Sequence, residues 1–257
     1  MKAESLLKVL TGAGVASRRR VADAIKQGRV SVNGNIAEDF RHPVDRVTDR
    51  ILLDGQPVDF ERQSPVYLVL NKPTGVLSTA RDGRGRKTVL GILPEKYRQL
   101  GLYPVGRLDK ESTGLLLMTN DGELTYRLTH PRFENEKEYL VCISETLAPV
   151  EKVKLKQGIM LDDGLTSPCR VREIKTSLLY NYSITMHEGR KRQIRRMFAA
   201  LGYRVLALQR IRMGKISLGA LKEGTIRELG AREISELQSE KRDYPGSILS
   251  KKVRKTE

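Results

Sequence analysis

Residues 106–122 read GRLDKESTGLLLMTNDG, and this stretch decides how the chain is built. Residues 115–118 form an apolar run without the alternation of a half-exposed strand, so they predict a strand buried on both faces. Residues 120–122 follow it, and their types favour a turn. Asp109 precedes the strand in a polar loop, where a rigid scaffold can hold a side chain for chemistry. The alternative is that the charged residues around Asp109 simply form a turn exposed to solvent.

The charge balance indicates a polyanionic partner. The 257 residues include 47 Lys and Arg against 31 Asp and Glu, for a net charge of +16. Nucleic acid fits this excess better than a membrane, because no basic amphipathic helix with a large apolar face is evident. No apolar run approaches the ~18 residues of a membrane span, and the first residues lack the apolar core of a signal peptide. We therefore expect a cytoplasmic protein without membrane contacts.

The residues that bind metals and cofactors are sparse. Cys142 and Cys169 are too few and too far apart for a metal site, and two thiols suit a reducing cytosol. The histidines are scattered along the chain, at His42, His130 and His187. The basic loop at residues 83–88 lacks the spacing of a phosphate-binding loop, and a flexible basic loop over RNA is the preferred interpretation. We expect neither a metal nor a cofactor.

Composition divides the chain into four parts. Residues 1–60 form a small module, and the polar stretch 61–65, which ends in proline, reads as a linker. Residues 66–240 form a larger domain with short strands and few helices. Residues 241–257 contain Pro-Gly and a basic cluster, so we expect a disordered basic tail.

The small module has an α/β pattern. An apolar helical pattern begins at Leu6 and stops near Gly12, and Ser17 is a plausible N-cap for a second helix. Residues 30–32 alternate as a strand into Asn-Gly, which is a strong hairpin signal. Residues 51–55 then predict the returning strand.

Two clusters of cations suggest phosphate contacts. Arg18, Arg19 and Arg20 occupy the first turn of the second helix, where the helix dipole disfavours cations by ~0.3–1 kcal/mol each. Phosphates would offset this cost, although exposed arginines can also tolerate it. Residues 188–197 hold a second cluster, in which like charges repel one another unless an anion is present. A solvated helix face is the alternative for Arg190, Lys191 and Arg192.

The Gly-Arg-Leu-Asp motif at residues 106–109, with the Thr-Gly-Leu-Leu-Leu-Met-Thr-Asn-Asp-Gly run after it, resembles the signature of the ribosomal pseudouridine synthases. The resemblance extends from about Leu6 to Leu229. Residues 13–19 and 28–34 are similar to the S4-like RNA-binding module that precedes the catalytic domain in that family. The resemblance implies that Asp109 is the catalytic residue. It also implies RNA contacts from the cations of the module, which are Arg18, Arg19, Arg20 and Arg29.

Other site residues follow from the same resemblance. Tyr139, in a Lys-Glu-Tyr sequence, would stack on the target uracil, although tyrosines on strands usually serve packing. Arg195 ends a Gly-Arg-x-x-Gln-Ile-Arg motif and would pair with the catalytic carboxylate, keeping it ionised in a dry pocket. Leu208 would close the uracil pocket, and Arg107 would fill the gap left by the flipped base. The Asn-Lys-Pro-x-Gly run at residues 71–75 would have a mainly structural role.

These observations together predict an α+β protein. A small α/β RNA-binding domain is followed by a mainly antiparallel catalytic domain with an RNA-binding cleft. The expected reaction converts a specific uridine of ribosomal RNA into pseudouridine after base flipping, with Asp109 as nucleophile or base. Large-subunit rRNA is favoured over small-subunit rRNA, and a monomer is expected. A non-catalytic rRNA-binding or ribosome-assembly protein is the alternative. A methyltransferase would need a glycine-rich cofactor loop after a strand, and the sequence has none of convincing form.

Overall fold

The computed structural model describes residues 3–16, 18–60, 64–175 and 179–239. Most of the predicted linker, the predicted tail and the N-cap candidate Ser17 lie outside these residues. The chain divides into two compact units. The first comprises Met1–Val66 with Pro94–Tyr103 and Thr119–Gly122, and the second comprises the remainder.

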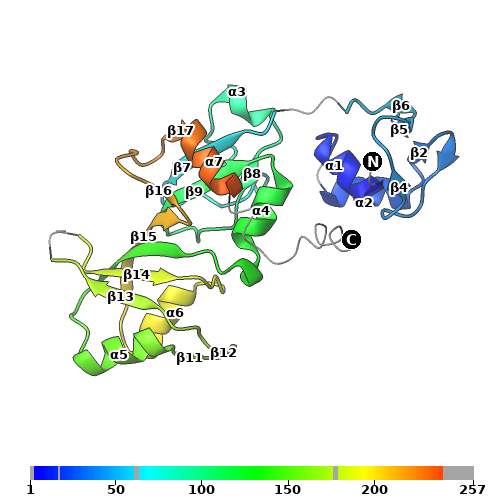
Figure 1. Cartoon of the computed structure of the whole chain (residues 1–257). Helices are drawn as coiled ribbons and strands as arrows, with labels where there is room; N and C mark the ends of the chain where they lie inside the picture. Colours follow the sequence, from blue (N-terminus) through cyan, green and yellow to red (C-terminus); the bar gives the residue numbers. More distant parts are fainter. Residues whose placement is uncertain (1–2, 17, 61–63, 176–178, 240–257) are drawn as a thin grey trace, which may run out of the picture. The chain divides into compact units, whose positions relative to one another are not determined.

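The N-terminal part of the first unit packs two helices against short antiparallel strands (Figure 1). The helices are α1 (Leu6–Gly12) and α2 (Arg18–Lys26). A sheet of order β3-β2-β5-β6 is built from β2 (Val30–Val32), β3 (Asn35–Ile36), β5 (Ile51–Leu53) and β6 (Gln56–Pro57). A separate pair joins β1 (Glu4–Ser5) to β4 (Pro43–Val44).

This α/β module forms for the reasons that its sequence indicated. Leu6, Leu10 and Ile25 are fully buried in one core, and each such side chain contributes roughly 1.5–3 kcal/mol on leaving water. The turn between β2 and β3 places Asn33 at φ 51° and Gly34 at φ 87°, as a tight hairpin of this type requires. Strand β5 returns to pair with β2 in antiparallel register, as predicted.

The second unit is centred on a nine-stranded sheet. Its main path runs β13-β14-β10-β15-β9-β7-β17, with β16 beside β15 and β8 beside β9. The strands are β7 (Tyr67–Lys72), β8 (Tyr103–Pro104), β9 (Thr113–Thr119), β10 (Lys137–Ile143), β13 (Arg170–Glu173), β14 (Tyr182–Met186), β15 (Val205–Met213), β16 (Ile216–Ser217) and β17 (Ile226–Glu228). The pairings of β13 with β14, β14 with β10, β10 with β15 and β7 with β17 are antiparallel, so the sheet is mainly antiparallel as expected.

Strand β9 is the predicted buried strand, and it pairs with β15 in parallel. Gly114 makes this close pairing possible, because a Cβ added there would lie 2.3 Å from the carbonyl oxygen of Arg210. Gly114 also has φ +100°, a conformation that side-chain-bearing residues rarely adopt. The Thr-Gly-Leu sequence at the start of the strand therefore serves both the backbone turn and the strand contact.

Helices cover the sheet in two groups (Figure 1). A core that includes Leu115, Leu117 and Leu124 lies under α4 (Gly122–Thr129) and α7 (Ala231–Ser239). The other half of the sheet carries α5 (Pro149–Gln157), α6 (Gln193–Ala200) and the small hairpin of β11 (Met160–Leu161) and β12 (Gly164–Leu165).

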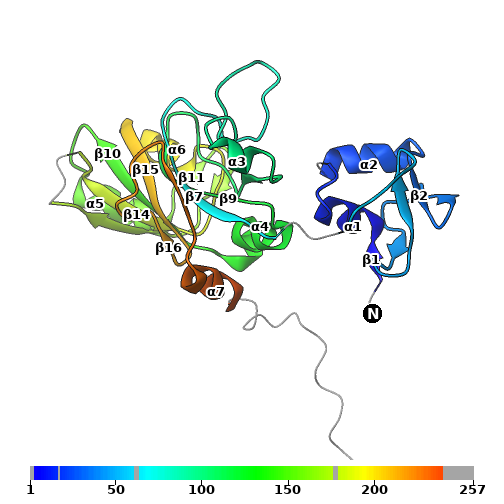
Figure 2. The same cartoon turned by 90° about the horizontal axis from the view of Figure 1, so that it is seen from above.

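The connections are short, apart from the segment between β7 and β9. That segment holds α3 (Glu95–Arg98), and in Figure 2 part of it extends as a long loop. A 3₁₀ turn (Pro131–Phe133) precedes β10. Among the described residues, no helix is long and apolar enough to cross a membrane.

Candidate active site

Asp109 lies in the loop that leads from β8 into β9, and its neighbour Leu108 fixes this loop from one side. The Ser78 hydroxyl donates to the carbonyl oxygen of Leu108 at 2.8 Å and accepts from the Leu108 amide at 3.0 Å. The amide of Ser112 donates to the carbonyl oxygen of Asp109 at 3.1 Å, which closes a turn. Asp109 itself is half-buried. The backbone on both sides of the carboxylate is therefore held, as a catalytic group requires.

Lys72 holds the same loop from the other side. This lysine is fully buried at the end of β7, and its Nζ donates to the carbonyl oxygens of Pro73 at 2.9 Å, Ser112 at 2.8 Å and Lys110 at 3.3 Å. Burial lowers the pKa of Lys72 to about 8, while the carboxylates of Glu111, Asp109 and Glu223 act in the opposite direction. The sequence motif predicts a structural role for this run but does not reveal these acceptors, since two of them follow Lys72 by about forty residues.

Arg195 is half-buried on α6, and its Nη1 donates to the carbonyl oxygen of Val205 at 2.9 Å. No ion pair within 4.0 Å joins Arg195 to Asp109 in the described parts of the chain. Burial lowers the pKa of Arg195 and Arg192 adds to this effect, whereas Asp109 and Glu111 oppose it. The predicted partners thus lie within electrostatic range of each other, and their pairing stays a prediction.

Tyr139 and Leu208 share one face of the sheet. Tyr139 lies opposite Arg210, and Val141, two residues further along β10, lies opposite Leu208. Cross-strand partners and residues two apart on a strand point to the same side. Both side chains are buried, with 9% of Tyr139 and 6% of Leu208 exposed.

Paired residues of β10, β15 and β9 connect this face to the loop that carries Asp109. Arg210 pairs with Tyr139 on β10 and with Gly114 on β9, five residues after Asp109. Neighbouring strands are ~4.8 Å apart, so Tyr139 lies two strands from the exit of the loop. The sheet therefore places the predicted stacking residue beside the loop that carries the predicted catalytic carboxylate.

Arg210 is a residue of this region that no sequence motif indicates. It is 2% exposed, and its Nε donates to the carbonyl oxygen of Leu115 at 2.8 Å. Its Nη2 is buried and has no hydrogen-bond partner among the described residues. The side chain links β15 to β9 just beyond the two residues where these strands pair. An arginine within a strand pattern was the available signal, because a buried arginine requires specific acceptors.

The predicted RNA-binding run at residues 190–192 precedes α6 instead of lying on a helix face, because α6 begins at Gln193. Arg190 donates to the carbonyl oxygens of Asp163, Gly164 and Leu165, and so fastens the turn of the small hairpin. The neighbouring Arg196 pairs with Asp162 and Asp163.

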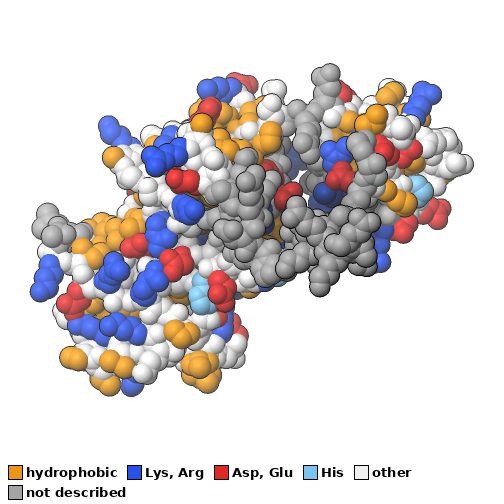
Figure 3. Space-filling view, viewed as in Figure 1, with side chains coloured by type: hydrophobic (Ala, Val, Ile, Leu, Met, Phe, Trp, Pro, Cys, Tyr) orange, Lys and Arg blue, Asp and Glu red, His pale blue; other side chains and the backbone are white. Residues whose placement is uncertain are grey.

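Arg192 and Lys191, the other two residues of the run, differ in their ion pairs. Arg192 pairs with Glu111 at 3.1 Å, whereas Lys191 is exposed and has no ion-pair partner among the residues described. The anions that the run requires therefore come partly from the chain itself. On the face shown in Figure 3, basic and acidic side chains are likewise interspersed. RNA contacts by these three residues stay a prediction.

Five other arginines predicted to contact RNA differ in their surroundings. Arg18, Arg19 and Arg20 are exposed in the first turn of α2, which contains no acidic residue. Arg29 instead forms a two-bond ion pair with Asp54, with distances of 2.6 Å and 2.5 Å. Arg107, the predicted gap-filling residue, is exposed beside Asp109 and makes no ion pair with another residue of the described ranges.

Fold, loop and motif together define a class of RNA-modifying isomerase. Residues 66–200 match the model of the RNA pseudouridylate synthase family, and residues 4–51 match the S4 domain. The chain therefore belongs to the RNA pseudouridylate synthase family and is an isomerase.

Individual relatives agree with this assignment. The chain is 42% identical to ribosomal large subunit pseudouridine synthase B of Bacillus subtilis (strain 168), over 80% of this chain and 84% of that protein. It is 40% identical to an uncharacterized RNA pseudouridine synthase of Aquifex aeolicus (strain VF5), over 90% and 92% of the two chains. A crystal structure of a pseudouridylate synthase superposes with a TM-score of 0.65 at 32% identity, covering 91% of this chain and all of that one.

Proposed function

We propose that the protein isomerises a specific uridine of ribosomal RNA to pseudouridine, with large-subunit rRNA as the favoured substrate. The observation that carries the proposal is the loop around Asp109, whose backbone is held by Ser78 and Lys72. The relative from Bacillus subtilis, named for the large ribosomal subunit, supports the choice of RNA.

The reaction breaks the bond between N1 of uracil and C1′ of the ribose, rotates the base, and joins C5 to C1′. The hydrogen on C5 leaves as a proton and N1 gains one, so the composition of the nucleotide does not change. No oxidant, reductant or added group is required. Asp109 supplies the reacting carboxylate, and Arg195, whose pKa Asp109 acts to raise, is the cation that we propose as its partner.

The target uridine must leave its helix before the carboxylate can reach C1′. Tyr139 and Leu208 lie on one face of the sheet beside the loop, where they provide an aromatic and an aliphatic wall for the flipped uracil. Arg107, exposed next to Asp109, fills the gap in the RNA. The exposed cations of α2 contact phosphates of the structured RNA and contribute affinity without selecting a base.

The decisive experiment measures tritium release from rRNA labelled at uridine C5, with wild type and Asp109→Asn compared on naked rRNA and on isolated subunits. We expect release by wild type only. The Asn variant should retain RNA affinity within about twofold, since the substitution removes a carboxylate but no cation that contacts phosphate.

Two other outcomes would contradict the proposal. Release by Asp109→Asn at the wild-type rate would remove Asp109 from the reaction. No release by wild type on either substrate, together with tight and salt-sensitive binding, would favour a non-catalytic rRNA-binding or ribosome-assembly protein.

A further inference from the structure

A groove of about 610 Å³ opens beside the catalytic loop. One wall is Glu111, two residues after Asp109. The rest of the lining comes from α6, the residue before it and the turn that follows it into β15, which supply Arg192, Arg195, Tyr203, Arg204 and Leu206. The volume lies within the range of sites that take small organic groups such as a nucleotide.

The groove has the charge of a nucleic-acid site. Three arginines line it, at positions 192, 195 and 204, against the single carboxylate of Glu111. Arg204 is exposed and makes no ion pair with another of the described residues. Its cation is therefore available for a phosphate.

The groove also has apolar surface that the fold does not use. Leu206 is 54% exposed although it belongs to a strand of the central sheet. Tyr203 lines the groove beside it, and its hydroxyl donates to Glu151 of α5 at 2.6 Å, which fixes the ring. A fixed aromatic ring and an exposed leucine provide contact area for a base at little cost in side-chain entropy.

The pair between Arg192 and Glu111 spans the two walls. Arg192 is held at φ 52°, ψ 30°, which is costly for a residue with a side chain. This backbone conformation places its guanidinium 3.1 Å from Glu111. A phosphate entering the groove can replace the carboxylate as the partner of Arg192.

We infer that this groove binds a nucleotide that neighbours the flipped uridine. Arg192 and Arg204 contact its phosphate, and Leu206 and Tyr203 contact its base or sugar. The inference rests on the proposed function, because it places the neighbouring nucleotide next to a uridine at Asp109. It adds Arg204 and Leu206 as determinants of substrate binding that take no part in the chemistry.

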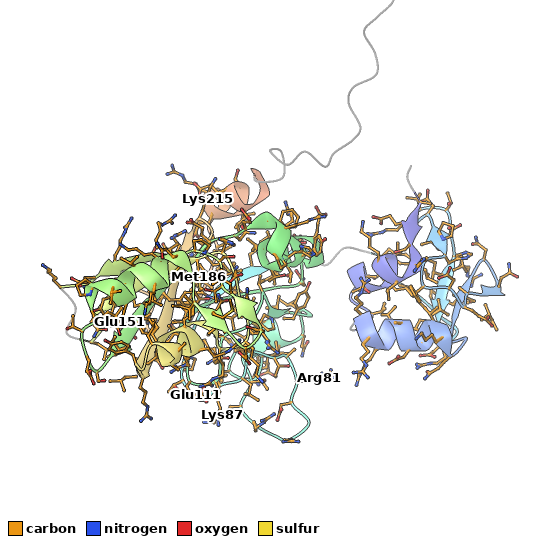
Figure 4. All side chains as sticks on the ribbon, turned by 90° about the horizontal axis from the view of Figure 1, so that it is seen from below. Arg81, Lys87, Glu111, Glu151, Met186 and Lys215 are labelled. Atoms are coloured by element: carbon orange, nitrogen blue, oxygen red, sulfur yellow. The ribbon has the colours of Figure 1, made fainter. Side chains whose placement is uncertain are left out.

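The test compares Arg204→Ala and Leu206→Ala with two matched controls. Lys215→Ala removes an exposed cation, and Figure 4 labels Lys215 on the opposite side of this unit from Glu111. Leu179→Ala removes a leucine of similar exposure, 57%, in the connection between β13 and β14. The probe is full-length large-subunit rRNA transcript, used both for tritium release and for binding at several salt concentrations.

We expect Arg204→Ala to raise KM and Kd by about fivefold, with kcat at saturating RNA within about twofold of wild type. The slope of log K against log salt concentration should become shallower by about 0.7, because one phosphate contact is lost. Leu206→Ala should raise KM by about threefold without changing the salt slope. Both controls should match wild type.

Equal KM, Kd and salt slope in the groove variants and the controls would overturn the subsite and leave the synthase assignment intact. A fall in kcat with unchanged KM would also overturn it, since the groove would then act on the chemical step. If wild type releases no tritium, the proposed function fails separately. The binding measurements then still test whether the groove contacts RNA, because they require no turnover.

Discussion

At the scale of single residues, Lys72 gives the clearest link between burial and pH. Its pKa is about 8 in the folded protein and 10.5 in an exposed lysine. Between these values the unfolded chain binds more protons than the folded chain. The contribution of Lys72 to the free energy of unfolding therefore rises with pH across this window, by at most ~1.4 kcal/mol per pH unit.

This pH dependence predicts the behaviour of Lys72→Met. The variant leaves the carbonyl oxygens of Pro73, Lys110 and Ser112 without their donor, so we expect a loss of roughly 1–3 kcal/mol in unfolding free energy at pH 9. Urea unfolding of both proteins from pH 7 to pH 10.5 measures the difference. The difference in unfolding free energy between wild type and variant should increase as the pH rises above 8. Parallel curves would show that Lys72 titrates alike in both states.

The pair between Glu111 and Arg192 gives a second prediction at this scale. Glu111→Gln removes the carboxylate that holds Arg192, and the freed guanidinium then contacts RNA phosphate. We expect RNA affinity to rise by about two- to fivefold at low salt, with a steeper salt dependence. Glu145→Gln changes an exposed carboxylate that does not line the groove and serves as the control. Equal affinities of the two variants would show that the pair does not compete with RNA.

Sequence and structure agree at this scale only where a motif exists. Asp109, Tyr139 and Arg195 could be proposed because each lies in a recognisable sequence motif. The contacts of Lys72 and Arg210 could not be predicted, because their acceptors are backbone carbonyl groups, which every residue carries. Only the fold determines which carbonyl group lies within reach of a buried cation.

At the scale of elements, local patterns predicted the strands and missed their long-range pairing. The apolar run of β9 and the Asn-Gly hairpin were both found, because burial and turn preference act over a few residues. The parallel contact of β9 with β15 depends on segments about 95 residues apart, as the bond from Arg210 to Leu115 shows. The start of α6 was also missed, since the left-handed conformation of Arg192 leaves no signal in an arginine.

The contact between β9 and β15 makes Gly114→Ala a sensitive variant. The new Cβ would lie 2.3 Å from a backbone oxygen of β15, which no side-chain rotation relieves, at a φ of +100°. We expect a loss of at least about 3 kcal/mol in stability, and a displaced Asp109 loop in any protein that still folds. Thermal unfolding and tritium release test this against Gly189→Ala, where an added Cβ meets no atom within 4 Å. Similar melting of both variants would contradict the close packing.

At the scale of the full chain, the surroundings of the basic side chains differ between the two units. Basic and acidic side chains are interspersed over the face of the second unit in Figure 3, so many cations on that face lie near carboxylates. The first turn of α2 differs, because Arg18 and Arg19 are exposed there and the turn contains no acidic residue. A cation in this position weakens the helix, which suggests that RNA binding and stability oppose each other in this module.

The double variant Arg18→Ala/Arg19→Ala should therefore bind rRNA more weakly and yet be more stable. We expect an affinity loss of about tenfold at low salt, because two phosphate contacts disappear. The free energy of unfolding of the module should rise by roughly 0.3–1 kcal/mol per arginine, since the helix dipole no longer opposes a cation. Filter binding across salt concentrations and hydrogen exchange of the α2 amides measure the two effects.

Lys26→Ala provides the opposite case for stability, because Lys26 lies in the last turn of α2, where the dipole favours a cation. Its α2 amides should exchange faster than those of wild type, while those of the double variant exchange more slowly. A double variant that loses affinity and stability together would show that the two arginines support the fold. A variant that gains stability and keeps its affinity would place the RNA contacts of the module elsewhere. Only the combination of greater stability and weaker binding assigns Arg18 and Arg19 to RNA.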